Sequence, residues 1–403
     1  MFPLLPTPAD SARAVAHVYS VSLLVSIPLV LALAAGLLAR HLSAGARALV
    51  WKGTIGAIAL ILLERLLPVA WLSWSVPYGL AAPLIALGRL QLAGLPSGVP
   101  GGSVDAVWAT TVWVVYVSGV ALCLIPVLHA TWTTQRTTRR AARLQDQRVA
   151  AQLRAARADL ALRRGARCVV SPTATTPYTV GLVFPVIVLP VAALRWSDSE
   201  LRAAFTHELA HVARWDVAST LAARIACAVL WFHPACWWVL RQMLRDSEHA
   251  VDDIVLSRGV RASDYASLLV RASDVRTDVQ LAGRALGGGH GLRARLAAIV
   301  STHRAAPTNW RHAACTAVLA LVIALPIGAV RLSPTRDALT LLLRDGRWES
   351  RAYAAAGLAQ RRDSVEVARA AARLDPNPRV RALARYALTQ PGRDLPSLLA
   401  ATP

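Results

Sequence analysis

The sequence of 403 residues is 55% hydrophobic and carries a formal net charge of +21. That length allows two or three domains, and the apolar residues come in blocks of about 18 or more, which is enough to cross a bilayer. The arginines cluster beside these blocks without an aromatic-interleaved basic motif, which favours a cytoplasmic membrane flank in contact with anionic lipid over direct nucleic-acid binding. We therefore expect an integral membrane protein.

The five cysteines include no Cys-x-x-Cys pair. We therefore expect neither a disulfide framework nor a zinc site built on cysteine. The first apolar block is too long for a signal peptide, and we expect it to stay in the membrane as an anchor.

Four membrane spans are expected, at about residues 14–39, 53–74, 104–132 and 313–330. Cytoplasmic loops carry an excess of arginine and lysine, and the basic segments here are residues 40–52 and 136–167. This asymmetry predicts a multi-pass protein of the cytoplasmic (inner) membrane, with both termini outside. The expected domains are residues 1–132 with three spans, 133–312 on the cytoplasmic side, 313–331 with the fourth span, and 332–403 outside.

The region after the third span changes from helical to β character. Residues 136–164 lack proline and are rich in alanine, arginine, leucine and glutamine, so one helix leaving the membrane is predicted. Residues 169–190 predict β structure bounded by prolines. Within it, Val186, Ile187 and Val188 are expected to form an edge strand to which an extended substrate can add. The alternative is a simple structural hairpin.

A helix with metal-binding character follows. Its start is predicted at Ser197, which can cap it, with Glu200 completing a capping box. The helix carries His-Glu-Leu-Ala-His at positions 207–211. Two histidines four positions apart share one helical face and can reach one ion, and Glu208 beside them can act as the catalytic base. The alternative is a helix with two solvated histidines.

The third metal ligand is expected from a separate helix, because a catalytic zinc usually has three protein ligands. Glu248 and Asp252 lie four positions apart in one candidate helix. Glu248 is expected to bind the metal, with His249 as the competing ligand. Asp252 and Asp216 are candidates for accepting the free N–H group of a ligand histidine.

The apolar segment of residues 217–240 lies between these ligands. A membrane crossing there would place His207 and Glu248 on opposite sides of a bilayer, roughly 30 Å apart, where one ion cannot bridge them. Trp231-Phe-His-Pro234 offers a break, because proline disrupts a helix interior. We therefore predict a helical hairpin that dips into the membrane.

The order of these features resembles the BlaR/MecR-type membrane metallopeptidases of β-lactam sensor-transducers, over roughly residues 1–330. The resemblance implies a gluzincin-type site holding one Zn²⁺ per chain, with His207, His211 and Glu248 as ligands and Glu208 as base. It also implies a cytoplasmic protein substrate, such as a small DNA-binding repressor, cleaved when an outside signal arrives. The motifs that carry it are Pro177-Tyr-Thr-Val-Gly181, Pro185-Val-Ile-Val-Leu-Pro190, the zinc helix through Asp216, Trp231-Phe-His-Pro234 and Glu248-x-x-x-Asp252.

The chain departs from the best-known members at its C-terminal end. Its one lysine is Lys52, so the Ser-x-x-Lys and Lys-Thr-Gly motifs of a penicillin-binding domain are impossible after it. A repeat with an offset of 30 residues stands there instead, in which Asp345 and Arg351 correspond to Asp375 and Arg381. The repeat resembles short HEAT-like helix pairs. We expect it to bind an unknown extracytoplasmic ligand or protein, or to act as a stabilising cap.

The expected fold class is mainly α: a polytopic membrane protein with about four spans, an α+β gluzincin-like domain with a small edge-strand sheet, and a helical repeat tail. The expected function is a signal-transducing zinc endopeptidase, in which Glu208 transfers the proton of the attacking water. Tyr265 and His233 are candidates for stabilising the oxyanion. The alternative function is a non-catalytic receptor that relays binding at the tail to a cytoplasmic partner.

Overall fold

The computed structural model describes residues 8–38, 42–64, 72–76, 82, 103–143, 146–274, 291–301 and 330–390, with scattered helical positions between 315 and 327. Helices dominate these residues. The chain divides into two compact units. One unit comprises Met1–Ser26, Leu60–Gly119 and Ala324–Pro403, and the other comprises Ile27–Ala59 and Val120–Ile323.

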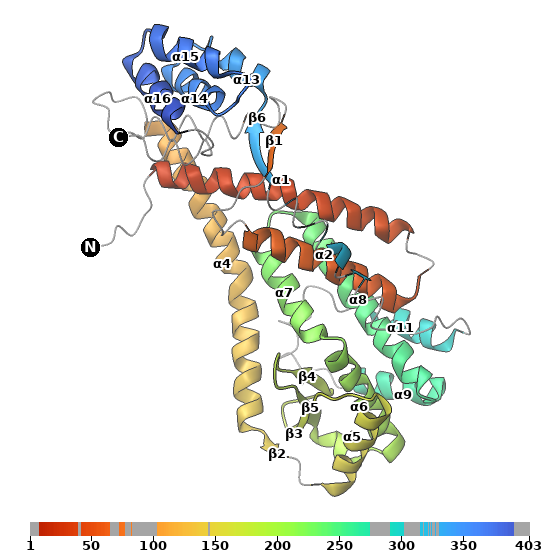
Figure 1. Cartoon of the computed structure of the whole chain (residues 1–403). Coiled ribbons are helices and arrows are strands. Elements are labelled where there is room, and N and C mark those ends of the chain that lie inside the picture. The colour runs from red at the N-terminus through yellow and green to blue at the C-terminus, as the bar shows by residue number, and fades with distance from the viewer. Residues whose placement is uncertain are drawn as a thin grey trace. The chain divides into compact units, whose positions relative to one another are not determined.

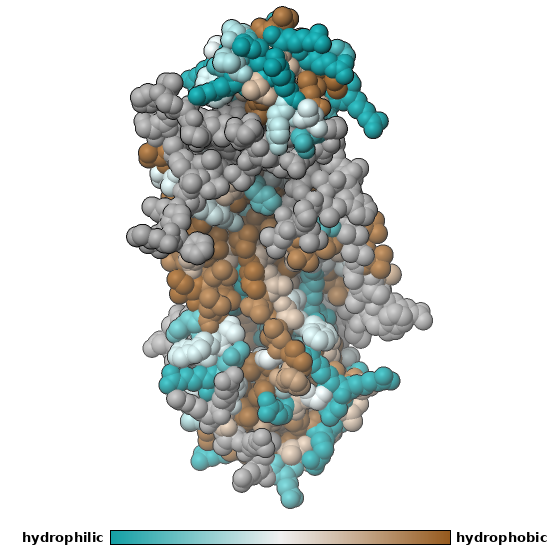
Figure 2. All heavy atoms as spheres, turned by 60° about the vertical axis from the view of Figure 1, so that its left-hand side comes forward, coloured by the Kyte–Doolittle hydropathy of each residue, from teal (hydrophilic) through white to brown (hydrophobic). Residues whose placement is uncertain are grey.

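Within the described residues, three helices are long and apolar enough to cross a membrane: α1 (Pro8–Leu38), α2 (Ala44–Glu64) and α4 (Ser103–Arg140) (Figure 1). None of the apolar window of α4 is buried, and Figure 2 shows apolar side chains gathered along the side where α4 lies. A helix that is apolar and exposed in this way suits a lipid environment. The predicted fourth span, residues 313–330, lies largely outside the described residues.

The second span differs from its prediction at both ends. Helix α2 begins at Ala44 instead of residue 53, so Arg47 and Lys52 lie inside it. The expected end at Trp74 is also wrong, because Leu72–Val76 form strand β1. Strand β1 pairs in parallel with β6 (Val330–Pro334), which satisfies backbone groups that a membrane helix would have paired internally.

The predicted single basic helix over residues 136–164 is wrong as well. Helix α4 ends at Arg140, and α5 (Gln147–Asp159) begins after a break that contains the short strand β2 (Ala142–Arg143). The carboxylate of Asp146 accepts hydrogen bonds from the backbone N–H groups of Arg148 and Val149. This side-chain cap starts a new helix in a segment whose composition favours a continuous one.

The sheet formed within residues 142–190 has the strand order β2-β3-β5-β4. Its longer strands are β3 (Arg167–Ser171), β4 (Tyr178–Val180) and β5 (Val186–Pro190). Strand β5 pairs in parallel with β3 and antiparallel with β4. The prediction that Val186, Ile187 and Val188 form an edge strand is therefore wrong: they lie in a buried inner strand, and β2 and β4 are the two edges of this sheet.

Helices α6 (Asp198–Ala213), α7 (Asp216–Val229) and α8 (Pro234–Ser257) follow a short 3-10 turn at Val191–Arg195. The predicted capping box of Ser197 and Glu200 is confirmed. The predicted break is confirmed too, since α7 ends at Val229 and α8 begins at Pro234. Leu201, Phe205 and Leu209 of α6 pack against α5 and β5 in one buried apolar cluster, which fixes α6 on the sheet.

Two further helices of this unit, α9 (Ala262–Asp274) and α11 (Gly291–Val300), pack against α8 or α6. The C-terminal region holds α13 (Arg336–Leu342), α14 (Trp348–Ala359), α15 (Val365–Leu374) and α16 (Pro378–Thr389), which share an alanine- and leucine-rich core. Each repeated arginine there, Arg351 and Arg381, donates to the main-chain carbonyl of its own aspartate, at 3.0 and 2.6 Å. The 30-residue repeat of the sequence is thus matched by repeated turn contacts, while its HEAT-like nature stays a prediction.

Candidate metal centre

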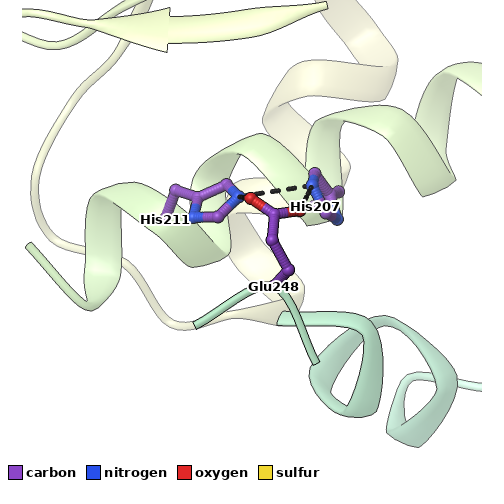
Figure 3. Close-up of side chains that lie close together, drawn as sticks. All are labelled: His207, His211 and Glu248. Atoms are coloured by element: carbon purple, nitrogen blue, oxygen red, sulfur yellow. Dashed lines mark hydrogen bonds and ion pairs between the residues drawn. The ribbon is translucent and has the colours of Figure 1, made fainter. Parts of the chain in front are cut away.

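Three side chains from two helices point toward one another (Figure 3). His207 and His211 lie one turn apart on α6, and their Nε2 atoms are 3.3 Å apart. Glu248 of α8 places its two carboxylate oxygens 3.8 Å from Nε2 of His207 and 3.6 Å from Nε2 of His211. One donor atom from each residue lies within 4.8 Å of the others. Two imidazoles and one carboxylate at this spacing fit a catalytic zinc site.

The second nitrogen of His211 is held by Asp216. Nδ1 of His211 lies 2.8 Å from a carboxylate oxygen of Asp216, the first residue of α7. The chain returns toward the site because Trp215 adopts a left-handed conformation with φ of 56°. Burial opposes the charged form of His211, but the hydrogen bond to Asp216 and the charge of Glu248 together raise its pKa to about 9. Asp216 has the position predicted for an acceptor of the free histidine N–H group.

His207 is held by a relay through Tyr265. The hydroxyl oxygen of Tyr265 lies 2.8 Å from Nδ1 of His207 and donates to Asp252 over 2.6 Å. Asp252 was predicted to accept from a ligand histidine directly, yet its carboxylate is 3.7 Å from Nδ1 of His207. Burial, followed by the positive charges of His211 and Arg295, lowers the pKa of His207 well below its usual value. A neutral imidazole is the form that binds a metal.

Glu208, the predicted base, is buried beside the two histidines. The hydroxyl group of Thr179 on β4 donates to its carboxylate over 2.7 Å. Burial raises the pKa of Glu208, and the positive charge of His211 and the hydrogen bond from Thr179 partly offset that rise. A carboxylate whose pKa lies closer to neutrality can accept and return a proton more easily than an exposed one.

Arg295 is a site residue that the sequence did not reveal. It lies on α11, and its guanidinium group binds both oxygens of Asp252 at 2.7 and 2.8 Å. A third nitrogen lies 2.9 Å from the carboxylate of Glu248. One arginine therefore holds two of the acidic residues on α8. Neither a motif nor a spacing marks it, since it stands in an alanine- and arginine-rich helix.

The two oxyanion candidates lie elsewhere than expected. Tyr265 is 1% exposed, and its hydroxyl group is engaged behind His207, on the Nδ1 side. His233 is the N-cap of α8, and a helix rises about 1.5 Å per residue, so His233 lies ~20 Å along α8 from Glu248. Neither faces the space between the three ligand atoms. The competing ligand His249 does not belong to the cluster either.

Part of the sequence that contains this site is similar to known proteins. Residues 100–299 match the family described as BlaR1 peptidase M56. The chain is also similar to the regulatory protein BlaR1 of Bacillus licheniformis, with 26% identity over 165 residues, which is 40% of this chain. The match spans about a quarter of that relative's length, 26%.

Proposed function

Because residues 100–299 match the BlaR1 peptidase M56 family, we propose that this chain is a membrane-embedded zinc endopeptidase that cleaves a cytoplasmic protein in response to an extracytoplasmic signal. The family match supports a membrane peptidase of a signal-transducing type, with a metal as the expected cofactor. The zinc ligands, the catalytic base and the substrate are parts of the proposal. A DNA-binding repressor is the substrate class suggested by the BlaR/MecR resemblance.

The observation that carries the proposal is the arrangement of the three donor atoms with an orienting partner behind each histidine. His211 is held by Asp216, and His207 by Tyr265. Such partners fix the tautomer and the ring orientation, so that both Nε2 atoms point at one ion. Two solvated histidines on a helix surface would lack these partners.

The proposed chemistry is hydrolysis of a peptide bond. Zinc at this site would polarise the scissile carbonyl and activate water. Glu208 accepts the proton of the attacking water and passes it to the leaving amine. Its side chain is buried next to His207 in the chain, and the hydrogen bond from Thr179 holds one of its carboxylate oxygens in place.

The proposed place for the substrate backbone is the outer edge of strand β4. Within the described residues, β4 pairs with β5 on one side only. Thr179, in the middle of β4, contacts Glu208, so the strand runs beside the base. An extended peptide adding to this edge would gain main-chain hydrogen bonds and lie next to the site.

The proposed topology places the peptidase region on the cytoplasmic side of the inner membrane, both termini outside, and the helices α13–α16 where an unknown ligand or protein can bind them. The basic residues at the end of α4 support this orientation, because the positive flank of a span is cytoplasmic. In this basic flank, the guanidinium carbon of Arg136 lies over the ring of Trp132, 5.2 Å from the ring centroid.

The test uses the full-length protein in detergent. About one zinc per chain is expected in the wild type, with loss of the metal in His211→Ala and Glu248→Ala. Glu208→Gln should keep the zinc but lose hydrolysis of fluorescently labelled casein. Zinc without any casein hydrolysis in the wild type would favour the non-catalytic receptor, and no zinc under metal-replete conditions would overturn the proposed site.

A further inference from the structure

Helix α2 reaches the metal site through its single lysine. The ammonium group of Lys52 contacts the carboxylate oxygen of Asp216 that His211 does not use, and it donates to the main-chain carbonyl of Arg214 over 2.8 Å. Side-chain exposure is only 13% for Lys52 and 8% for Asp216. A buried cation is costly unless it is paired, so this lysine is held at Asp216.

The carboxylate of Asp216 is thereby held from two sides. One oxygen accepts from Nδ1 of His211, and the other is bound by Lys52. The carboxylate cannot rotate without breaking one of these contacts. Lys52 therefore helps to fix where the acceptor of His211 stands, together with Arg214, whose Nε lies 3.5 Å from the oxygen that faces His211.

Helix α2 also holds the helix that supplies the third ligand. Arg47 binds one oxygen of Asp246 at 2.7 and 2.9 Å, and the indole N–H group of Trp51 donates to the other oxygen over 2.7 Å. Asp246 is buried on α8, two residues before Glu248. The ring of Trp51 also packs edge-on against Trp238 of the same helix, with centroids 5.3 Å apart.

Both helices that carry the ligands are thus attached to one apolar helix. Lys52 acts at the end of α6, where Asp216 follows, and Arg47 with Trp51 acts on α8 beside Glu248. We propose that α2 is a positioning element of the zinc site, in which Lys52 orients His211 through Asp216 and the pair of Arg47 and Trp51 sets the place of Glu248 through Asp246. This inference rests on the proposed function, since it concerns the same site.

The consequence is that α2 sets the spacing between the two histidines and the glutamate. A displacement of α2 relative to α6 and α8 would alter both carboxylate contacts together. The proposal therefore makes a measurable claim about variants in a helix that contributes no metal ligand: they should change metal binding and metal geometry.

The experiment measures zinc affinity by chelator competition, and the visible absorption spectrum of the cobalt-substituted full-length protein. Lys52→Met should weaken zinc binding by about tenfold, the lower end of the range for loss of a group that contacts a ligand directly, because Lys52 acts through Asp216. It should also shift the cobalt spectrum. Arg148→Gln is the matched control. Arg148 pairs with Asp198 at the other end of α6 over 3.0 Å, and both side chains are exposed. It should change neither measurement.

A double-mutant cycle tests whether Lys52 acts through Asp216. Asp216→Asn combined with Lys52→Met should bind zinc no more weakly than Asp216→Asn alone. Fully additive losses would contradict the route through Asp216, and an unchanged affinity in Lys52→Met would overturn the role of Lys52.

Asp246→Asn provides a second, independent variant if Lys52→Met does not fold. It replaces the carboxylate that accepts from Arg47 and Trp51 by an amide, which has one acceptor oxygen and no negative charge. The variant should lower zinc affinity and shift the cobalt spectrum. An unchanged affinity and spectrum would overturn the role of α2 at Glu248. Failure of the proposed function is recognised separately, because the wild type itself would then bind no zinc, or would bind zinc without hydrolysing casein.

Discussion

The hydroxyl group of Tyr265 lies between Nδ1 of His207 and the carboxylate of Asp252, at 2.8 and 2.6 Å. Because the hydroxyl donates its proton to Asp252, its oxygen is left to accept from the imidazole. The tautomer of His207 with the proton on Nδ1 is then favoured, and Nε2 carries the lone pair that a metal needs. His207 and His211 are therefore oriented by different chemistry, a phenol in one case and a carboxylate in the other.

Replacing Tyr265 by phenylalanine should test this relay. The substitution keeps the buried ring but removes the acceptor of the His207 N–H group, so we expect zinc affinity to fall about tenfold. Asp252 keeps the bidentate contact from Arg295, and the fold should persist. Chelator competition measures the zinc affinity, and thermal unfolding of the metal-free protein checks that the fold persists. Equal zinc affinity in both proteins would show that the hydroxyl does not orient His207.

A second prediction concerns Thr179 and the proton-accepting base. Thr179→Val is nearly isosteric and removes the hydrogen bond that stabilises the ionised form of Glu208. The pKa of Glu208, already raised by burial, should rise further. The base would then be protonated at a higher pH, so the acid limb of kcat/KM for casein should move upward in pH while zinc content stays the same.

The matched control for this variant is Thr173→Val. Thr173 lies in the turn after β3, and its hydroxyl group contacts that of Ser171, the last residue of β3, at 2.9 Å. Its pH profile should coincide with that of the wild type. If Thr173→Val and Thr179→Val shift the acid limb equally, the effect belongs to the stability of the sheet rather than to Glu208.

The zinc helix could be predicted from sequence because its signals are local. The spacing of His207 and His211, and the capping pair of Ser197 and Glu200, lie within one helix and depend on the helical period alone. The break before α8 follows likewise from one residue, Pro234. This break lets α8 bring Glu248 close to the two histidines. The sequence argument required this, because one ion has to contact all three ligands.

The features that sequence reasoning missed depend on partners distant in the chain. Arg47 and Lys52 have the pattern of a basic flank, since their partners Asp246 and Asp216 follow 199 and 164 residues later. The prolines that bound β5 are typical of an edge strand. Its parallel pairing with β3, which precedes β4 in the chain, could not be seen in the sequence. Arg295 likewise meets Asp252 across 43 residues.

A third prediction follows from the pKa of His211, which is raised to about 9. Below that pH the imidazole of the metal-free protein is protonated, and zinc must displace the proton. The apparent zinc affinity should therefore rise with pH, approaching tenfold per unit between pH 7 and 9, and level off above pH 9. Chelator competition at several pH values measures the slope.

Asp216→Asn is the informative variant for this slope. It removes the negative charge that helps to raise the pKa of His211, and it replaces the carboxylate acceptor of the hydrogen bond by a weaker amide oxygen. Zinc binding should be weaker, yet its dependence on pH between 7 and 9 should become shallower. A slope as steep as that of the wild type would mean that Asp216 is not what holds the proton on His211.

The last prediction compares two buried arginine–aspartate pairs. Arg295→Met leaves Asp252, whose side chain is 4% exposed, without its cation. Breaking a buried pair from one side costs about 3 kcal/mol. Hydrogen exchange in α8 and α11 should therefore quicken, and zinc affinity should fall because Glu248 loses its contact with Arg295.

Arg351→Met removes a comparable cation from Asp375, whose side chain is 7% exposed, within the C-terminal helices. A similar loss of folding stability is expected from the same physical cause. The faster hydrogen exchange should be confined to α14–α16, and zinc affinity should be unchanged. Hydrogen exchange with mass spectrometry resolves the two regions in one experiment. Equal loss of zinc in both variants would show that zinc affinity follows the stability of the whole chain and not the contact between Arg295 and Glu248.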